Sequence, residues 1–326
     1  MEKISIIIPV FNESGNLLLL HPSIHKAMEC VQEPWEVIYV NDGSSDDSGM
    51  KLDTLALSDP EHVGVVELRR NFGQTAAISA GIDNADGDVI VLMDADLQND
   101  PADIPMMIEK IGEGYDVVSG WRVNRQDKFF SRRVPSRIAN GLISFVTGVR
   151  LHDYGCTLKA YRREVLTGFR LYGEMHRFIP AYASLVGARI IEVPVHHHPR
   201  KYGKTKYGIN RAAKVILDLF TVKFMLTYSH KPIYLFGGTG ALLMGISLVM
   251  LVFLIINRIL FLEHMVRSPL LLMSMMLFIM GFQSILLGLI AELLARTYHE
   301  SQHKPTYTIR KVIVGGHETM RRGYTI

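Results

Sequence analysis

The chain has 326 residues, a formal net charge of +3 and two cysteines. The small net charge gives no indication of nucleic-acid binding, and the wide separation of Cys30 and Cys156 argues against a disulfide scaffold and fits a reducing compartment. The length suffices for one sizeable α/β domain and an appendage. A strand pattern begins at Ile4, so we expect no signal peptide and a cytosolic N-terminal domain.

Short apolar runs alternate with helical segments through the first 200 residues. This alternation predicts βαβ units and a mainly parallel sheet, because strands buried on both faces read as continuous apolar runs. The first predicted helix follows Pro9, with Asn12 or Ser14 as its candidate cap, and an Ala-rich helix ends near Ala85. The predicted strands are 4–10, 35–40, 63–68, 89–93, 116–120 and 192–195.

The fourth predicted strand ends in two carboxylates, Asp94 and Asp96. Alternate residues of an extended chain point the same way, so both carboxylates can address one point at the carboxyl edge of the sheet, where open α/β folds bind ligands. A less specific interpretation is a loop acid with Asp96 or Asn99 capping the next helix. The pair, followed by Gln98, favours a hard divalent cation that is shared with a substrate phosphate.

Polar turns also follow the first two predicted strands. Residues 9–13 follow the first strand and Asp42 follows the second, so both turns share a crevice with the paired carboxylates. The crevice fits a nucleotide, with the base and ribose near the first two strands and the diphosphate near the fourth. A P-loop is excluded, since residues 203–205 match the end of that motif but its first glycine would fall on His198.

Two long segments without charge lie in the last third of the chain, at 232–257 and 268–291. A spanning helix needs about 20 apolar residues, so we expect two transmembrane helices. Two spans return the chain to its starting side, and the tail is richer in Lys and Arg than the connecting loop. The positive-inside rule therefore places both termini in the cytosol of a multi-pass plasma-membrane protein. Three small residues four apart suit close helix contact: Gly237, Ala241 and Gly245.

Two further predicted helices, at about 129–149 and 207–230, combine a wide apolar face with flanking Lys and Arg. Core packing is the alternative, but the basic flanks favour helices that lie in the membrane interface. We expect the tail to pack little core, although residues 306–314 could form a strand, with a neighbouring subunit as one partner. The predicted division is a catalytic domain at 1–206, an amphipathic helix at 207–230, two spans at 231–298 and a tail at 299–326.

Several motifs in order resemble family 2 glycosyltransferases of the GT-A fold. They are Ile-Pro-Val-Phe-Asn-Glu at 8–13, Asn-Asp-Gly-Ser-Ser-Asp at 41–46, Asn-Phe-Gly-Gln at 71–74 and Asp-Ala-Asp-Leu-Gln at 94–98. Three more motifs are Gly-Trp-Arg at 120–122, Asp153 with Gly155, and Arg-x-x-Gly-x-Thr-Lys at 200–206. These resemble motifs of the polyprenyl-phosphate glycosyltransferases, which include bactoprenol glucosyltransferases and dolichol-phosphate mannose synthase. The resemblance covers roughly residues 1–230, and the two spans match the bacterial architecture. Asn41 replaces the first Asp of many members, which leaves the nucleotide base open.

The resemblance implies a role for individual residues. The nucleoside would be contacted by Pro9, Val10, Asn12, Glu13 and Asp42. Mg²⁺ or Mn²⁺ on the diphosphate would be held by Asp94, Asp96 and Gln98. Arg122 would contact phosphate. The acceptor lipid phosphate would be bound by Arg132 and Ser136. Arg200 and Lys206 would close over the donor or the acceptor. Asp153 lies near a turn, where it would face the sugar or the active-site loop, or act as a cap.

The implied reaction is the inverting transfer of one hexose, glucose from UDP-glucose, to undecaprenyl or a similar polyprenyl phosphate at the cytosolic face. A lipid phosphate is already anionic and needs no general base. The reaction then requires a cation on the leaving diphosphate and arginines on the attacking phosphate. The expected partners are the nucleotide sugar, polyprenyl phosphate, membrane lipid and further copies of the chain, up to a tetramer; nucleic acid is not expected.

Alternative functions remain at this stage. A mannose synthase using GDP-mannose or a UDP-aminopentose transferase would use the same residues. A processive polysaccharide synthase is disfavoured because the chain lacks a Gln-x-x-Arg-Trp motif. A lipid flippase or transport subunit would explain the spans but not the paired carboxylates, and a pure binding or scaffold role is the third possibility. The three consecutive histidines at 196–198 diverge at a strand end, so they do not predict a metal site.

Overall fold

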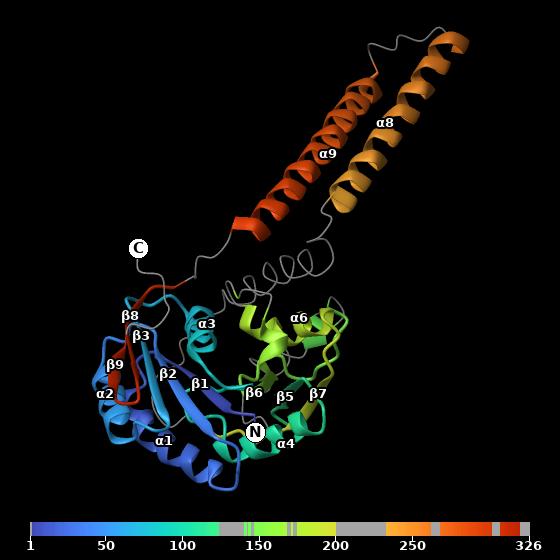
Figure 1. Ribbon diagram of the computed structural model, residues 1–326. Helices are drawn as coiled ribbons and strands as arrows, with labels where there is room; N and C mark the ends of the chain where they lie inside the picture. The colour runs from blue at the N-terminus through green and yellow to red at the C-terminus, as the bar shows by residue number, and fades with distance from the viewer. Residues whose placement is uncertain are drawn as a thin grey trace. The chain divides into compact units, whose positions relative to one another are not determined.

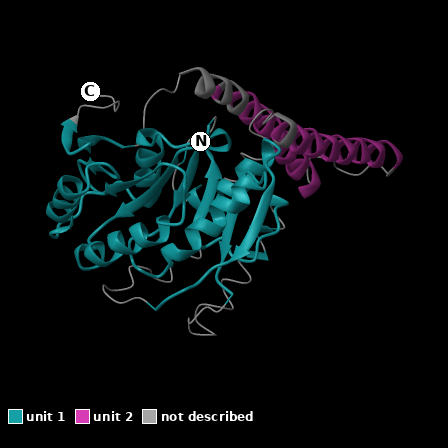
Figure 2. Cartoon of the chain, turned by 60° about the horizontal axis from the view of Figure 1, so that its bottom comes forward, with its two compact units in different colours: residues 1–222, 304–326 teal, residues 223–303 magenta. Residues whose placement is uncertain are grey.

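The computed structural model describes residues 2–123, 140–141, 143–144, 147–167, 171, 175–199, 233–261, 268–301 and 307–319. The chain divides into two compact units (Figure 2). Residues 1–222 and 304–326 form the first unit, which contains a β-sheet, and residues 223–303 form the second, which contains two long helices. The predicted interface helix at 207–230 lies outside the described residues, as does most of the one at 129–149.

The described part of the first unit is built around a nine-stranded sheet (Figure 1). Across the sheet the strands run in the order β7-β5-β6-β4-β1-β2-β3-β8-β9. Neighbours among β1 to β4 are parallel, as is the pair of β5 and β7, so the predicted mainly parallel α/β sheet is confirmed. The strands are β1 (Ile4–Val10), β2 (Trp35–Asn41), β3 (Val63–Leu68), β4 (Val89–Leu92), β5 (Val117–Trp121), β6 (Lys159–Arg162), β7 (Ile190–Pro194), β8 (Ile309–Val314) and β9 (His317–Thr319).

Helices cover both faces of this sheet. Figure 1 shows α1, α2 and α4 on one face and α3 and α6 on the other. The apolar side chains of β1 that face α1 are fully buried, and they share one core with Leu17, Leu20 and Ile24 of that helix. The helices are α1 (Ser14–Met28), α2 (Ser48–Ser58), α3 (Gln74–Asn84), α4 (Ile104–Gly112) and α6 (Ile179–Leu185), with short 3₁₀ turns η1 (Pro101–Asp103), η3 (Arg163–Leu166) and η4 (Met175–Phe178).

Strand β6 was not predicted from the sequence. It lies between β4 and β5 and is antiparallel to both. Its four residues, Lys-Ala-Tyr-Arg, begin and end with a charge and give no apolar run. The strand exists because its backbone pairs with two strands that are already apolar, and this long-range pairing leaves no local pattern.

The tail differs from the expectation that it packs little core. Strand β8 pairs antiparallel with β3 of the same chain, with Val312 opposite Val66. Val312 and Tyr307 are buried, and the Tyr307 hydroxyl donates to Asp83 Oδ2 at 2.6 Å. The partner strand therefore belongs to the same chain, and β8 covers what would otherwise be the exposed edge of β3.

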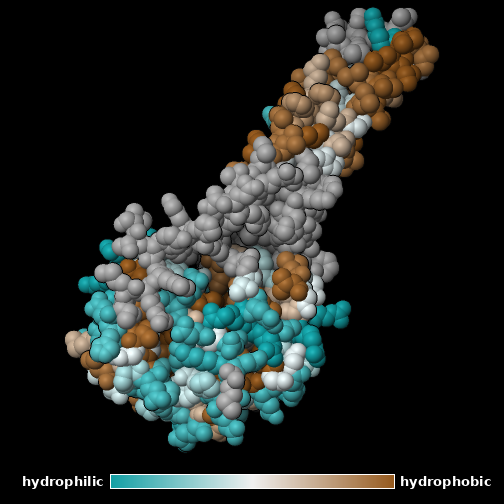
Figure 3. Space-filling view, viewed as in Figure 1, coloured by the Kyte–Doolittle hydropathy of each residue, from teal (hydrophilic) through white to brown (hydrophobic). Residues whose placement is uncertain are grey.

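The second unit contains α8 (Ile233–Phe261) and α9 (Pro269–Ser301). Their apolar stretches, Phe236–Leu260 and Pro269–Ile290, have 25 and 22 residues and mean hydropathies of 2.6 and 2.2. Each exceeds the roughly 20 residues that a spanning helix needs. Apolar residues make up most of the described surface of both helices on the face that Figure 3 shows, and the two predicted spans are confirmed as candidate membrane helices.

Helices α8 and α9 touch through glycine. A Cβ added to Gly240 would lie 2.5 Å from the Gly281 carbonyl oxygen, and a Cβ on Gly281 would lie 2.6 Å from that of Gly240. Farther along, Ser247 Oγ donates to the Ser274 carbonyl at 2.6 Å. The predicted contact stripe is wrong, because Ala241 and Gly245 are exposed. The contact face is rotated by one residue, so that glycine faces glycine and the backbones approach closely.

Replacing Gly240 by leucine should separate the two helices, because its side chain would enter the Gly281 backbone. We expect the free energy of unfolding to fall by about 2 kcal/mol or more, which is typical of an overpacked site. The measurement is the melting temperature of the detergent-solubilised protein, which should be lower. Gly245→Leu is the matched control, since no atom of the described residues lies within 4 Å of a Cβ there. Equal melting temperatures for the two variants would contradict the described contact.

Candidate active site

The candidate site begins with the loops that follow β1 and β2. The Asp42 amide donates to the Val10 carbonyl at 2.8 Å. The Asn12 amide donates to Ser44 Oγ at 3.0 Å, and the Ser45 amide donates to Asn12 Oδ1 at 2.8 Å. These bonds join residues 10–13 and 41–45 into one wall. The structure thus brings together the predicted nucleoside-contacting residues: Pro9, Val10, Asn12, Glu13 and Asp42.

Asp42 is buried and shapes a third loop. Its carboxylate accepts the Phe72 amide at 2.7 Å and the Gly73 amide at 3.0 Å. Burial raises the pKa of Asp42, while these two amide bonds act in the opposite direction. Next to it, Gly43 has φ +65°, and a Cβ there would lie 2.4 Å from the Arg70 carbonyl carbon. Only glycine fits this turn, so the loops after β2 and β3 pack backbone to backbone.

Asp94 follows β4 and is held on both of its oxygens. Gln74 Nε2 donates to Asp94 Oδ1 at 2.7 Å, and Thr157 Oγ1 donates to Asp94 Oδ2 at 2.7 Å. Asn99 Nδ2 donates to the same threonine hydroxyl at 3.0 Å. The Asp94 carboxylate is therefore oriented by side chains from the start of α3 and from the loop before β6.

The turn after Asp94 places a second carboxylate beside the first. Asp96 is buried, and its Oδ1 accepts the Gln98 amide at 3.1 Å. Leu97 has φ +58°, a conformation that costs a leucine roughly 1–2 kcal/mol and that is found at functional sites. The proposed helix caps are wrong at this turn: Asp100, and neither Asp96 nor Asn99, caps η1 through the Ala102 amide.

The two carboxylates fit a divalent cation. Burial and the negative charge of Asp96 raise the pKa of Asp94 to about 6. The two negative charges repel each other, and a cation bound between the carboxylates removes that repulsion. Carboxylate oxygens are the ligands that Mg²⁺ and Mn²⁺ prefer. The donor set of Asp94 and Asp96 therefore matches the predicted metal site, and Gln98 lies on the same turn.

Arg122 and Asp153 form a bidentate ion pair. Arg122 Nε donates to Asp153 Oδ2 at 2.6 Å and Nη2 donates to Oδ1 at 2.9 Å. Asp153 is buried, and its amide donates to Glu192 of β7 at 3.0 Å. The Arg122 charge partly offsets the rise in the pKa of Asp94 that burial and Asp96 cause, so the pair lies close enough to the carboxylates to act on them.

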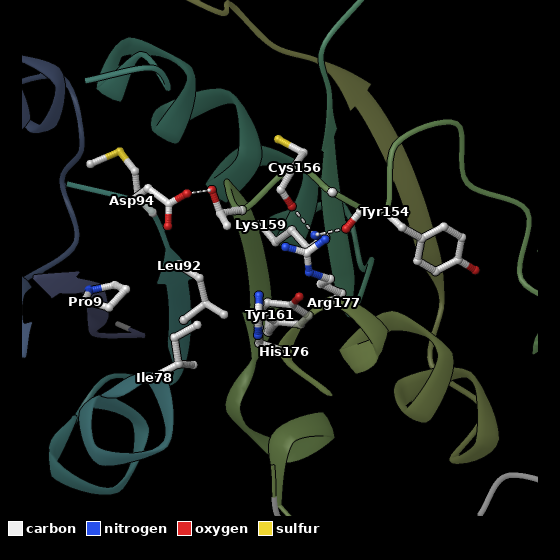
Figure 4. A pocket seen from close by; sticks show the side chains of 13 residues that line it. Pro9, Ile78, Leu92, Asp94, Tyr154, Cys156, Lys159, Tyr161, His176 and Arg177 are labelled. Atoms are coloured by element: carbon white, nitrogen blue, oxygen red, sulfur yellow. Dashed lines mark hydrogen bonds between the residues drawn. The ribbon is translucent and has the colours of Figure 1, made fainter. Parts of the chain in front are cut away.

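A pocket lies beside Asp94 (Figure 4). Lys159 lines it and is fully enclosed; its ammonium donates to the carbonyls of Tyr154 and Cys156, which holds the loop that carries Thr157. His176 lines it too, with Nδ1 2.7 Å from Thr75 Oγ1. Burial lowers the pKa of His176 well below its usual value, so the ring is neutral. Arg177 supplies a second cation to the same pocket.

Sequence reasoning missed several of these residues. Gln74 ends one of the motifs quoted above but was not predicted to contact Asp94. The contacts of Thr157 with Asp94 and with Asn99 give no sequence signal, because each joins residues far apart in the chain. The histidines at 196–198 diverge as expected: His196 Nδ1 contacts Asp103 at 2.7 Å and His198 Nε2 contacts Asp100 at 2.9 Å. The predicted acceptor residues Arg132, Ser136, Arg200 and Lys206 lie outside the described residues.

Thr157→Val keeps the shape of the threonine but removes the hydroxyl that donates to Asp94. Loss of such a supporting hydrogen bond costs a metal site about 10–100-fold in affinity or activity. We expect the Mn²⁺ concentration for half-maximal enzyme activity to rise at least about tenfold. Thr54→Val on α2 is the control, because that exposed hydroxyl bonds only to the Met50 carbonyl. An unchanged metal requirement would show that the Thr157 bond does not orient Asp94.

The fold and the site together define a class of protein. A mainly parallel sheet carries a polar wall after β1 and β2 and a carboxylate pair after β4, the arrangement of a GT-A glycosyltransferase. The sequence profile of glycosyl transferase family 2 matches residues 5–169. The chain belongs to this family and is a glycosyltransferase.

Relatives share nearly the whole chain. A dodecaprenyl-phosphate galacturonate synthase of Rhizobium johnstonii (strain DSM 114642 / LMG 32736 / 3841) is 41% identical over 95% of this chain and 93% of its own length. An undecaprenyl-phosphate 4-deoxy-4-formamido-L-arabinose transferase of Enterobacter sp. (strain 638) is 37% identical over 97% and 95%. Glucosyl-3-phosphoglycerate synthase from Mycobacterium tuberculosis, crystallised with Mn²⁺ and UDP-glucose, superposes with a TM-score of 0.52 at 19% identity, over 68% of this chain and 79% of its own. That likeness is one of fold.

Proposed function

We propose that this glycosyltransferase moves a single sugar from a nucleoside diphosphate donor to a polyprenyl phosphate in the membrane. The carboxylate pair of Asp94 and Asp96, in a chain that also carries two candidate membrane helices, is the observation that supports this most directly. Both full-length relatives described above act with a polyprenyl phosphate according to their names. A flippase or transport subunit would have no use for a nucleotide crevice with a cation site.

The proposed site has a donor side and an acceptor side. Pro9, Val10, Asn12, Glu13 and Asp42 line the nucleoside wall. Asp94 and Asp96, with Gln98, would hold Mg²⁺ or Mn²⁺, which neutralises charge on the leaving diphosphate. Gln74 and Thr157 keep the Asp94 carboxylate turned toward that position. Arg132 and Ser136 for the acceptor phosphate, and Arg200 and Lys206 for closure, are carried over from the sequence.

The acceptor phosphate oxygen attacks the anomeric carbon as the bond to the diphosphate breaks. This oxygen is ionised at neutral pH, so the site needs no general base. Arg122 is held by Asp153 at a fixed place near Asp94, where its charge offsets the approach of two anions. Direct displacement inverts the configuration at the anomeric carbon.

The names of the two relatives contain sugars other than the glucose that was expected from the sequence. We propose galacturonate, the sugar in the name of the 41% identical relative, and Arg177 supports it because a guanidinium beside Asp94 suits a sugar carboxylate. The formamido-arabinose of the 37% identical relatives is the second candidate. The competing donors are UDP-glucose, which would supply glucose, and GDP-mannose, which would supply mannose.

We further propose that the chain is a multi-pass protein of the plasma membrane with both termini in the cytosol. The proposed segments are a catalytic part at 1–206, an amphipathic helix at 207–230, spans within 231–298 and a tail at 299–326, whose strand β8 joins the catalytic sheet. An impermeant label that reached the tail from outside intact cells would contradict this topology. Association into a homo-oligomer is a prediction that the mass of the detergent-solubilised protein tests.

A donor panel tests the function. Purified full-length protein is incubated with undecaprenyl phosphate, Mn²⁺ or Mg²⁺, and one labelled donor at a time: UDP-galacturonate, UDP-4-deoxy-4-formamido-L-arabinose, UDP-glucose or GDP-mannose. We expect a labelled lipid with UDP-galacturonate and at least about tenfold less with each other donor, the size of one mismatched polar contact or more. Labelled lipid from another donor alone would replace the sugar assignment, and no labelled lipid from any donor would contradict the proposed function.

A further inference from the structure

A second cluster of metal-binding side chains lies far from the active site. His21 and His25 are one helical turn apart on α1, and Asp59 and His62 lie in the connection between α2 and β3. His25 Nε2 lies 2.6 Å and His21 Nε2 3.4 Å from the same oxygen, Asp59 Oδ2. One ligand atom from each of His21, His25 and Asp59 lies within 4.8 Å of the others.

This cluster and the active site lie at opposite edges of the sheet. His62 immediately precedes β3, and Trp35, which begins β2, stacks on its ring at 4.2 Å. Asp42 follows the other end of β2. The seven residues of β2 extend roughly 20 Å at about 3.3 Å per residue. The cluster is therefore not part of the sugar-transfer site.

We propose that His21, His25 and Asp59 form a binding site for a transition-metal ion, with Zn²⁺ as the metal that suits it best. Two imidazole nitrogens and one carboxylate oxygen are a ligand set that Zn²⁺ uses, whereas Mg²⁺ prefers oxygen ligands alone. Spacing of four residues on a helix puts both imidazoles on one face, and the carboxylate comes from a different segment. A fourth position would be left for water.

The surroundings orient these three side chains as the partners of metal ligands do. The other ring nitrogen of His21, Nδ1, lies 3.2 Å from the buried Tyr39 hydroxyl, which leaves Nε2 for the metal. The other oxygen of Asp59, Oδ1, lies 2.9 Å from His62 Nδ1. His62 is a positioning residue in this arrangement. His21 is buried and His25 is partly exposed, so the site has an inner wall and an opening to solvent.

The proposed ion would join α1 to the connection between α2 and β3. These segments come from two successive βαβ units. Both histidines of α1 contact Asp59, and the rings of His25 and His62 pack on each other at 5.0 Å. A metal bound only by the folded protein stabilises it by RT ln(1 + c/Kd), where c is the free metal concentration and Kd the dissociation constant. We therefore assign the site a structural role, independent of which sugar the enzyme transfers.

The test uses full-length, tag-free protein in detergent, stripped of metal and supplied with excess Mg²⁺ so that the active-site carboxylates are occupied. Zn²⁺ is titrated by calorimetry, and the melting temperature is followed in parallel. We expect one tight Zn²⁺ per chain and a melting temperature that rises with Zn²⁺. His25→Gln and Asp59→Asn should each weaken binding by more than about tenfold, and His62→Gln by about tenfold. His317→Gln, an exposed histidine on β9, should bind as the wild type does.

Two outcomes would overturn the proposal. One is wild-type protein that binds Zn²⁺ no better than His25→Gln, in which case the cluster is a hydrogen-bonded network. The other is tight binding that survives in both His25→Gln and Asp59→Asn. Melting temperatures in the presence of EDTA show whether each variant folds, and His62→Gln tests the site with all three ligands intact. Because the readout is Zn²⁺ binding and not sugar transfer, failure of the proposed function would leave this result unaffected.

Discussion

Asp94→Ala and Asp96→Ala should each lower kcat/KM for sugar transfer by about 1,000-fold or more, because each removes a charged ligand from the proposed cation site and with it the neutralisation of the leaving diphosphate. The measurement is transfer of labelled sugar to polyprenyl phosphate at saturating Mn²⁺. Asp94→Asn gives a sharper version, since it keeps the shape of the side chain and removes the charge; its one amide oxygen can accept from either Gln74 or Thr157, but not from both. We expect it to be nearly as inactive as Asp94→Ala.

Glu109→Gln is the matched control for these variants, because Glu109 is an exposed acid on α4. It should leave transfer unchanged within about twofold, as expected for an exposed position away from the site. The metal assignment also requires that EDTA abolish the wild-type activity and that added Mn²⁺ or Mg²⁺ restore it. Near-normal turnover by Asp94→Ala, or full activity in EDTA, would exclude a cation held by this pair.

Asp153→Asn should lower both stability and activity. The substitution removes the carboxylate charge that pairs with the largely buried Arg122 guanidinium. Asp153 and Arg122 have side-chain exposures of 3% and 14%. Breaking a buried ion pair on one side costs about 3–5 kcal/mol, which corresponds to roughly 6–20 °C in melting temperature for a domain of this size. The measurement is thermal unfolding of the detergent-solubilised protein, followed by donor and acceptor kinetics at a temperature where the variant is folded.

The surface pair of Arg310 and Glu67 is the control for this prediction. Arg310 has a side-chain exposure of 70%, so Arg310→Ala should cost less than about 1 kcal/mol. The double variant Arg122→Met/Asp153→Leu separates two roles of the buried pair. If it regains the stability lost in Asp153→Asn but not the activity, the Arg122 charge acts in the reaction. If it regains both, the pair only holds the loop in place.

The position of the candidate site could be predicted because it depends on strand ends. A continuous apolar run followed by a polar turn indicates where a buried parallel strand stops, and parallel strands end at the same edge. Residues 89–96 and 35–42 show this pattern, and in the structure Asp94 and Asp96 follow β4 and Asp42 follows β2. The partners of those carboxylates could not be predicted. Thr157 is 63 residues from Asp94, and no local spacing relates two residues that meet only when β6 inserts beside β4.

Local sequence patterns were enough to predict strands β1 to β5 and β7, the carboxyl edge at which the acids gather and the two apolar helices, because burial imposes a period and a length that single segments display. Three features became visible only in the folded chain: β8 completes the sheet of its own chain, Gly240 contacts Gly281, and His21, His25 and Asp59 converge. Each of these depends on the pairing of distant segments. Such pairing is selected by packing and hydrogen bonding in the folded chain, and it leaves no periodic trace in either segment alone.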